Sequence, residues 1–272
     1  MRTAAALLEG PLQPVKVVDL DIEPPRAGEV MVEIAATGVC HSDLSVADGS
    51  LDNPMPIVLG HEGAGSIIEI GAGVTDLAVG DHVVLAWLAQ CGKCFYCVHG
   101  QAELCERAGL SFARSNLPDG TTRLSHHGAP VFQMAGLGTF AQHCVVPARS
   151  AVRVPDQLPF ESAALIGCAA LTGFGAAVNT ADIRAGDSVA VIGGGGVGLN
   201  AVQGARAAGA ARIIVVDPSA ERREFAAVSG FSQQDFEGQG SGMQLHGDVA
   251  AGAAVGADQE DFHCSNLRVE KG

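Results

Sequence analysis

The sequence predicts a β-rich first part followed by the beginning of an α/β domain with a doubly wound parallel sheet. Up to about residue 165, short β-like runs alternate with Gly and Pro turns. A strand, a glycine turn, a helix and a second strand then follow one another over residues 187–217, as in dinucleotide-binding units. The predicted domains are the β-rich part, the start of the α/β part and a separate tail, over residues 1–165, 166–229 and 230–272.

The individual elements are expected from hydrophobic periodicity and from turn residues. In the β-rich part, the expected strands cover residues 30–36, 66–70, 82–87 and 140–146. A helix is expected over residues 160–179. The expected α/β unit consists of a strand, an Ala-rich helix and a second strand, over residues 187–192, 197–208 and 212–217.

Composition and charge restrict the class of protein. The chain has 272 residues, of which 47% are hydrophobic, so it can bury a core and is not globally disordered. Its net charge of -14 would repel phosphate backbones and anionic lipid headgroups. Glu9 interrupts the apolar start too early for a signal peptide, and Gly, Thr and Asn interrupt the run 162–181. We therefore expect a cytoplasmic protein that binds neither nucleic acid nor membrane.

Four cysteines lie close together in the sequence, at positions 91, 94, 97 and 105. Four thiolates are the number that a closed tetrahedral zinc site requires. Without an export signal, thiolates are favoured over the alternatives of two local disulfides or four unrelated thiols. Cys91, Cys94, Cys97 and Cys105 are therefore predicted to hold one structural zinc.

The glycine turn of the α/β unit predicts a dinucleotide site. Backbone amides there can approach a pyrophosphate at the positive end of the following helix. Asp217 comes nineteen residues after the last glycine, at the end of the second strand. A carboxylate at this position accepts hydrogen bonds from the ribose hydroxyls and repels a 2'-phosphate. NAD is therefore expected rather than NADP. The predicted loop residues are Gly193, Gly195, Gly196, Val197 and Gly198.

Several motifs together resemble those of zinc-dependent alcohol dehydrogenases in the medium-chain dehydrogenase/reductase superfamily. Residues 117–128 and 138–140 are similar to the long-loop branch, which contains class III and related bacterial enzymes. The resemblance reaches about residue 229 and implies a GroES-like β-barrel catalytic domain followed by a Rossmann domain. The matching segments, in family order, are Gly38-Val-Cys-His-Ser-Asp43, Gly60-His-Glu-Gly-Ala-Gly65, the four-cysteine segment, Gly167-Cys168 with Thr172-Gly173, and the glycine turn.

The resemblance assigns roles around a catalytic zinc. Cys40, His61 and Cys168 match its three protein ligands, although each alone would be read as an ordinary core residue. Ser42 matches the hydroxyl that takes the alcohol proton, but Ser45 stands where the family usually continues the proton relay with a histidine. The acids nearby match a group that orients the histidine ligand and a group behind the zinc, and these are Asp43 and Glu62.

The resemblance also assigns residues that contact the substrate and the cofactor. Trp87 matches an aromatic residue of the substrate pocket, and an ordinary core indole is the alternative. Arg222 matches a basic residue beside the adenosine ribose. His41 and Thr172 match positions near the pyrophosphate and the nicotinamide. A solvent-facing, packing or capping role is the alternative for these last three.

The tail, residues 230–272, contains only eight Leu, Ile, Val or Phe residues, and no strand is expected there. Because a doubly wound domain has about six strands, most of that fold is not recognisable in the sequence. One hypothesis is a tail foreign to the fold, through a frameshift, a truncation or a damaged gene copy. The alternative is a divergent functional short form.

The motifs thus predict an enzyme that oxidises an alcohol to an aldehyde or ketone by hydride transfer to NAD, with one catalytic and one structural zinc. A catalytically inactive zinc-binding remnant is the alternative. A zinc-free reductase that uses NADPH is disfavoured by the complete ligand set and by Asp217. The expected partner is a small alcohol or aldehyde. The intact family forms homo-oligomers, which is doubtful for this chain.

Overall fold

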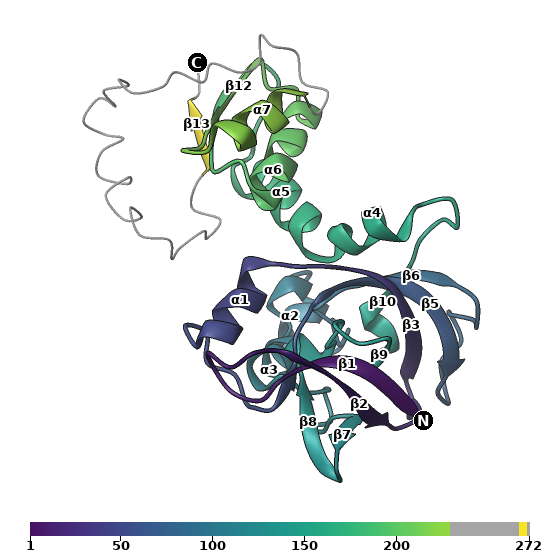
Figure 1. Cartoon of the computed structure of the whole chain (residues 1–272). Helices are drawn as coiled ribbons and strands as arrows, with labels where there is room; N and C mark the ends of the chain where they lie inside the picture. Colours follow the sequence, from purple (N-terminus) through teal and green to yellow (C-terminus); the bar gives the residue numbers. More distant parts are fainter. Residues whose placement is uncertain (229–266, 271–272) are drawn as a thin grey trace. The chain divides into compact units, whose positions relative to one another are not determined.

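The computed structural model describes residues 1–228 and 267–270 (Figure 1). The chain divides into two compact units, Met1–Cys168 and Ala169–Gly272. Each unit has its own core of buried apolar side chains, and the two are described separately below.

The first unit contains a closed barrel in which strands far apart in sequence are neighbours. Short turns join β1 to β2 and β7 to β8, and β4 closes the barrel by pairing with β1 and β8. Its core is apolar, with Leu7, Leu20, Met31 and Val145 almost completely buried. The order around the barrel is β1 (Arg2–Leu8), β2 (Lys16–Ile22), β7 (Leu124–His126), β8 (Ala129–Gln133) and β4 (Ile57–Val58).

A five-stranded antiparallel sheet contains the strands that the sequence predicts for this unit. The central pair, β3 and β5, has two register shifts, between Met31 and Val32 and between Ile34 and Ala36. The strand expected over 140–146 begins later, at His143. Before it, residue 140 bonds to the backbone of a loop and of β1, and residue 142 bonds to the backbone of both β1 and β3. The order is β10 (Ala151–Arg153), β6 (His82–Leu85), β5 (Glu62–Ile70), β3 (Glu29–Gly38) and β9 (His143–Pro147).

Short helices lie in the connections between the strands of the first unit. Gly49, in the left-handed conformation, ends α1 after two turns. The short helices η1 and α2 precede α3, which packs against η2. Their bounds are α1 (His41–Asp48), α2 (Phe95–Val98), η1 (Ala102–Leu104), α3 (Glu106–Arg114), η2 (Met134–Gly136), η3 (Ala148–Ser150) and α4 (Phe160–Leu165).

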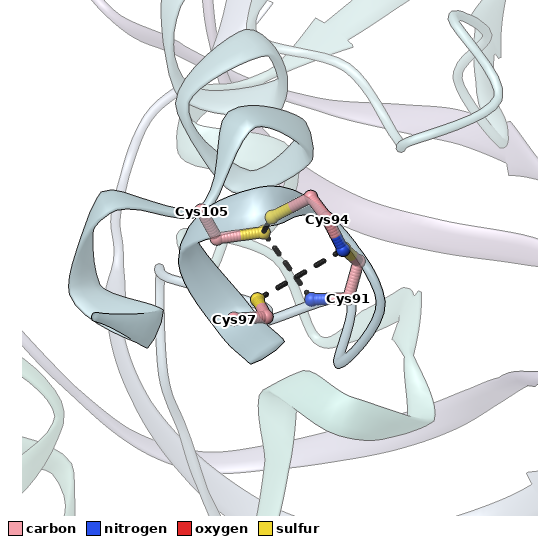
Figure 2. A group of neighbouring side chains, drawn as sticks. All are labelled: Cys91, Cys94, Cys97 and Cys105. Atoms are coloured by element: carbon pink, nitrogen blue, oxygen red, sulfur yellow. Dashed lines mark hydrogen bonds between the residues drawn. The ribbon is translucent and has the colours of Figure 1, made fainter. Parts of the chain in front are cut away.

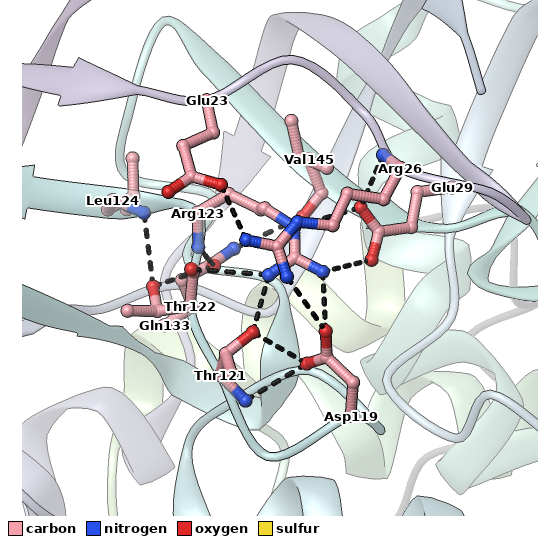
Figure 3. A network of polar contacts seen from close by, with 10 residues as sticks. All are labelled: Glu23, Arg26, Glu29, Asp119, Thr121, Thr122, Arg123, Leu124, Gln133 and Val145. Atoms are coloured by element: carbon pink, nitrogen blue, oxygen red, sulfur yellow. Dashed lines mark hydrogen bonds and ion pairs between the residues drawn. The ribbon is translucent and has the colours of Figure 1, made fainter.

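A buried arginine ties the segment before β7 to the start of β3 (Figure 3). Arg123, 1% exposed, donates from Nε and Nη2 to both carboxylate oxygens of Glu29, at 3.0 and 2.5 Å. It also donates to Asp119 Oδ2 at 2.7 Å and to Thr121 Oγ1 at 2.5 Å. The Arg26 backbone N–H donates to Glu29 at 2.9 Å. Each carboxylate therefore has more than one partner, as a buried charge requires.

The predicted helix over 160–179 forms as a continuous run of α and π turns. It comprises α4, then the π-helical η4 (Ile166–Ala170), α5 (Leu171–Gly175) and the π-helical η5 (Ala176–Thr180). By length and hydropathy alone, residues 160–180 could cross a membrane, which differs from the expectation that polar residues interrupt the segment too strongly. The core helix of a soluble protein passes the same test, so this is weak evidence for a membrane span.

The second unit contains the predicted strand, glycine turn, helix and strand, which follow α5 and η5. β11 (Ser188–Ile192) and β12 (Arg212–Val216) are parallel and in register, with Val189 opposite Ile213. The helix α6 (Gly196–Ala207) connects them, and α7 (Ala220–Val228) follows. Val191, Val202 and Val215 are among the buried residues of this core. A parallel pair with a helical crossover is the first unit of a Rossmann sheet.

The expectation that residues 230–272 contain no strand is wrong. β13 (Leu267–Glu270) pairs antiparallel with β11, and Val269 lies opposite Val189. The physical reason is that β11 has a second edge, whose backbone groups need partners. The rest of the predicted tail lies outside the described residues.

Candidate metal and dinucleotide sites

The structure brings one group of possible metal ligands together from three distant segments. Cys40 is the N-cap of α1, His61 and Glu62 stand at the start of β5, and Cys168 lies in η4. Their ligand atoms all lie within 4.8 Å of one another. His61 and Glu62 are 4% and 2% exposed, whereas both cysteines are partly exposed. We call this group the first metal group.

Asp43 fixes the geometry of the first metal group from behind. This carboxylate is 2% exposed and accepts three hydrogen bonds. The Cys40 N–H donates to Oδ2 at 2.8 Å, and the Gly60 N–H donates to Oδ1 at 3.0 Å. His61 Nδ1 lies 3.2 Å from Oδ1. Because one ring nitrogen faces Asp43, the other nitrogen of His61 is left for a metal.

Two glycines allow the close backbone packing around the first metal group. A Cβ atom on Gly38 would lie 2.0 Å from a carboxylate oxygen of Glu62. A Cβ atom on Gly167 would lie 2.3 Å from the carbonyl oxygen of Leu85, at the end of β6. Any larger residue would therefore displace Glu62 or the segment that carries Cys168. Both glycines belong to the motifs of the sequence, but a sequence motif does not show which atoms these glycines approach.

Hydrogen bonding and burial shift the pKa values of the first metal group. The Cys168 side chain hydrogen-bonds to Cys40, which lowers the pKa of Cys40 and raises that of Cys168. Burial alone would lower the pKa of His61, but its bonds to Asp43 and Cys40 raise it to about 10. Burial raises the pKa of Glu62. A cation that binds here must therefore displace protons from His61 and Cys168.

The other residues predicted for catalysis lie around this group with different exposures. Ser42 is partly exposed, and its Oγ is 3.8 Å from Cys40 Sγ. His41 is exposed at the first position of α1. Trp87 is partly buried, packs against the core of the five-stranded sheet and contacts the ring of Phe112. Sequence reasoning did not single out Phe112, because no spacing rule links residues 87 and 112.

The four clustered cysteines form a second group, the cysteine lobe, defined by Cys91, Cys94, Cys97 and Cys105 (Figure 2). The Sγ atoms of Cys91 and Cys97 are 4.0 Å apart, as are those of Cys94 and Cys105. A disulfide would need about 2.05 Å. With Zn–S bonds of about 2.3 Å, the edges of a tetrahedral site measure about 3.8 Å. The described cysteines are all free, so the lobe has the spacing of a metal site and not of disulfides.

Backbone amides also point at the lobe sulfurs. The Cys91 N–H donates to Cys105 Sγ, and the Cys94 N–H donates to Cys91 Sγ, both at 3.3 Å. A backbone hydrogen bond from Lys93 is the main cause that lowers the pKa of Cys91, to about 6. Desolvation raises the pKa of Cys97 to about 11. Burial would raise the pKa of Cys105, but backbone hydrogen bonds from Ala108 and Cys91 outweigh it and lower the pKa. The lobe therefore presents more than one thiol that ionises readily, and metal binding must displace the remaining protons.

The glycine turn of the second unit is shaped by close backbone packing. Gly193 has a φ of +100°, which favours glycine. A Cβ atom on Gly198 would lie 1.8 Å from the Gly193 carbonyl oxygen. Gly195 is the N-cap of α6, and a Cβ atom there would meet nothing within 4 Å. The turn thus places open backbone at a helix N-terminus, which is suited to a phosphate.

Asp217 lies directly after β12 and is bonded to this glycine turn. The Gly194 N–H donates to its Oδ2 at 2.7 Å, and the Ser219 N–H donates to its Oδ1 at 2.8 Å. Arg222 Nη1 lies 3.7 Å from Oδ2. These residues line a pocket of about 550 Å³ that Phe225 also borders. Thr172, also predicted here, is partly exposed on α5, a helix that packs against α6.

The structure thus combines a barrel unit with a cysteine and histidine metal group, a four-cysteine lobe and a following glycine-turn unit. This is the combination that the resemblance to zinc-dependent dehydrogenases predicts. Residues 26–156 match the family described as the alcohol dehydrogenase GroES-like domain. The chain is therefore similar to zinc-dependent alcohol dehydrogenases, with a GroES-like barrel followed by the first unit of a Rossmann sheet, which confirms the predicted resemblance and fold class.

Individual relatives agree with this family. The chain is 46% identical over 226 residues to the putative alcohol dehydrogenase D of Mycobacterium tuberculosis, covering 83% of this chain and 61% of the relative. It is 40% identical over 244 residues to an S-(hydroxymethyl)glutathione dehydrogenase of Escherichia coli, covering 87% and 66%. The crystal structure of benzyl alcohol dehydrogenase from Acinetobacter calcoaceticus matches with a TM-score of 0.79 and 34% identity, covering 85% and 63%. The chain thus spans about 61% to 66% of these relatives' lengths.

Proposed function

We propose that this chain binds two zinc ions and NAD and oxidises an alcohol to an aldehyde or ketone by hydride transfer to NAD. The observation that carries the proposal is the first metal group, in which Cys40, His61 and Cys168 converge with their ligand atoms within 4.8 Å. Two thiolates and one imidazole suit zinc and leave a fourth position for a water molecule or a substrate. The proposed enzyme is cytoplasmic.

The residues of the first unit would have separate roles in metal binding and proton transfer. Cys40, His61 and Cys168 would hold the catalytic zinc, with Glu62 behind it, and the cysteine lobe would hold the structural zinc. The catalytic zinc supplies a Lewis acid that lowers the pKa of an alcohol bound to it. Ser42, two residues after a ligand, would accept the alcohol proton. Asp43 would keep His61 in one orientation through its 3.2 Å contact.

The second unit would bind the cofactor. Backbone amides of Gly195, Gly196 and Val197, at the start of α6, would contact the pyrophosphate. Asp217 would accept hydrogen bonds from the adenosine ribose, with Arg222 beside it. His41 and Thr172 are proposed near the pyrophosphate and the nicotinamide. NAD is preferred because the buried Asp217 carboxylate repels a 2'-phosphate.

Trp87 would form one wall of the substrate site, so we propose primary alcohols with an aromatic group as substrates. Its partly buried indole offers a flat apolar surface. The structural relative named benzyl alcohol dehydrogenase supports this class, and the relative named S-(hydroxymethyl)glutathione dehydrogenase supports a thiol adduct of formaldehyde as the competing substrate.

The test combines metal content, NAD binding and turnover of the purified full chain. Two zinc ions per chain are expected in the wild type, and one each in C40S and C97S, which remove one ligand from each group. C144A is the matched control, because Cys144 is buried in β9 and belongs to neither group. NADH formation from benzyl alcohol that C40S abolishes and C144A retains would support the enzyme.

A zinc-binding protein without turnover is the second candidate. It is favoured by the single parallel strand pair among the described residues of the second unit. Two zinc ions per chain without measurable NAD binding would establish this second candidate and refute the first.

A further inference from the structure

A pair of aromatic rings connects α3 with the segment that follows β6. Trp87 and Phe112 have ring centroids 5.2 Å apart and an interplanar angle of 51°. This separation lies in the range of favourable aromatic pairs. Both side chains are partly exposed. Trp87 is the only tryptophan of the chain, so tryptophan fluorescence reports on the surroundings of this residue alone.

Phe112 is fixed to the cysteine lobe through α3. Cys105 is the N-cap of this helix and is 2% exposed. Phe112 follows seven residues later, so it lies on nearly the same face of the helix, about 10 Å further along its axis. Ala108 and Ser111, on α3 between them, are buried and hold the helix against the unit. The position of the Phe112 ring therefore depends on the position of the Cys105 thiolate.

Trp87 is fixed to the first metal group through β6. It comes two residues after Leu85, and the Leu85 carbonyl lies so close to Gly167 that a Cβ atom there would be only 2.3 Å away. Cys168 is the next residue. The Ala86 N–H donates to the Ser150 carbonyl at 2.8 Å and holds the segment between them. The backbone next to Trp87 is thus in contact with the segment that supplies a metal ligand.

The same segment leads back into the cysteine lobe. Cys91 is only four residues after Trp87. Arg149 Nη1 donates to the Gln90 carbonyl at 3.2 Å, which anchors the approach to the lobe. The chain therefore leaves Trp87, passes through the four cysteines and α3, and returns to Trp87 at Phe112. A metal bound by the four cysteines would restrict the motion of the chain between Trp87 and Phe112.

We propose that Phe112 is a positioning residue that makes the placement of Trp87 depend on metal in the cysteine lobe. The inference rests on the proposed zinc occupancy of the lobe. When the lobe holds its ion, Cys105 fixes the start of α3, and the Phe112 ring covers Trp87. When the ion is lost, the first turn of α3 is released, and the Phe112 ring moves away from Trp87. The lobe thereby controls one wall of the proposed substrate site.

The experiment measures acrylamide quenching of Trp87 fluorescence, together with zinc content, in five full-length proteins. These are the wild type, F112L, C97S, the double variant F112L/C97S, and F95L. F95L is the matched control, because Phe95 lies in the same lobe but its ring contacts are with Tyr96 and His99. F112L keeps an apolar side chain on α3 and does not touch the cysteines, so it should retain both zinc ions.

The expected result is that F112L increases the quenching constant about twofold, because it removes the ring that packs against the indole. C97S should produce a similar increase in the wild-type background and little further increase in F112L. F95L should leave quenching unchanged. This pattern, with two zinc ions retained in F112L, supports the inference.

Three results would overturn the inference while leaving the proposed function intact. The first is unchanged quenching in zinc-loaded F112L. The second is an equal effect of C97S with and without Phe112. The third is an F95L effect as large as that of F112L. A wild type that holds no zinc in the lobe is a different outcome, because it refutes the proposed function as well.

Discussion

Replacing Asp43 with asparagine tests whether this carboxylate positions the first metal group. Asp43 is 2% exposed and accepts from the backbone N–H groups of Cys40 and Gly60, on different oxygens. An amide has one oxygen and one NH₂ group. Whichever way the introduced amide turned, its NH₂ group would face one of these N–H donors. The side chain has nearly the same size, so the substitution removes acceptors without opening a cavity.

The magnitude follows from the donor that loses its acceptor. A buried donor without a partner costs about 1–3 kcal/mol. Zinc binding requires Cys40 and His61 in the arrangement that Asp43 holds, so this cost falls on the zinc-bound state. Since every 1.4 kcal/mol is a factor of ten in affinity, D43N should weaken zinc binding at the first metal group by about 10- to 100-fold. The same range is typical when a partner of a metal-bound histidine is removed. The cysteine lobe does not contact Asp43 in the structure, so its affinity should not change.

The assay is competition for zinc against a chromophoric chelator, carried out in the C97S background so that only the first metal group is read. D48N is the matched control, because Asp48 is exposed at the other end of α1 and accepts from the Ser50 N–H. If D43N and D48N held zinc equally tightly, the positioning role of Asp43 would be refuted.

Three further predictions concern the barrel and the glycine turn. R123M should lower the free energy of unfolding of the barrel unit by about 3–5 kcal/mol, because it leaves the buried Glu29 carboxylate without its guanidinium, and urea denaturation measures this. Burial would raise the pKa of Asp119, but the hydrogen bonds from Arg123 and Thr121 outweigh burial and lower this pKa to about 2. The contribution of Asp119 to the free energy of unfolding is therefore complete above about pH 4 and is lost as the pH falls towards 2. The stability difference between wild type and D119N should shrink over that range. G198A should destabilise the second unit by about 1–3 kcal/mol and weaken NAD binding, because its Cβ atom would lie 1.8 Å from a carbonyl oxygen.

Each of these predictions has a contradicting outcome. For R123M, it is a loss of stability under about 1 kcal/mol, as for an exposed ion pair. For Asp119, it is a stability difference that stays constant from neutral pH down to about pH 2. For G198A, it is a wild-type melting temperature of the second unit together with unchanged NAD binding.

The sequence predicted those parts of the molecule that local patterns determine. The glycine turn and its two strands lie where periodicity placed them, because a buried parallel strand and a helix N-terminus each have a characteristic local pattern. Three features escaped prediction. The bonds between Arg123 and Glu29 join residues 94 positions apart, and no periodicity encodes such a distant pair. The contact of Phe112 with Trp87 depends on how α3 docks. β13 was missed because a four-residue strand is decided by the free edge beside it.

The two metal groups differ in how much chain each one closes. All four thiolates of the cysteine lobe come from residues 91–105, whereas Cys40 and Cys168 are separated by about 130 residues. Because the entropy of loop closure rises by about 0.6 kcal/mol with each doubling of length, closing the longer loop costs about 2 kcal/mol more. During synthesis, the lobe can capture its ion as soon as residue 105 is free. The first metal group must wait for residue 168, so we expect the two ions to be acquired in that order.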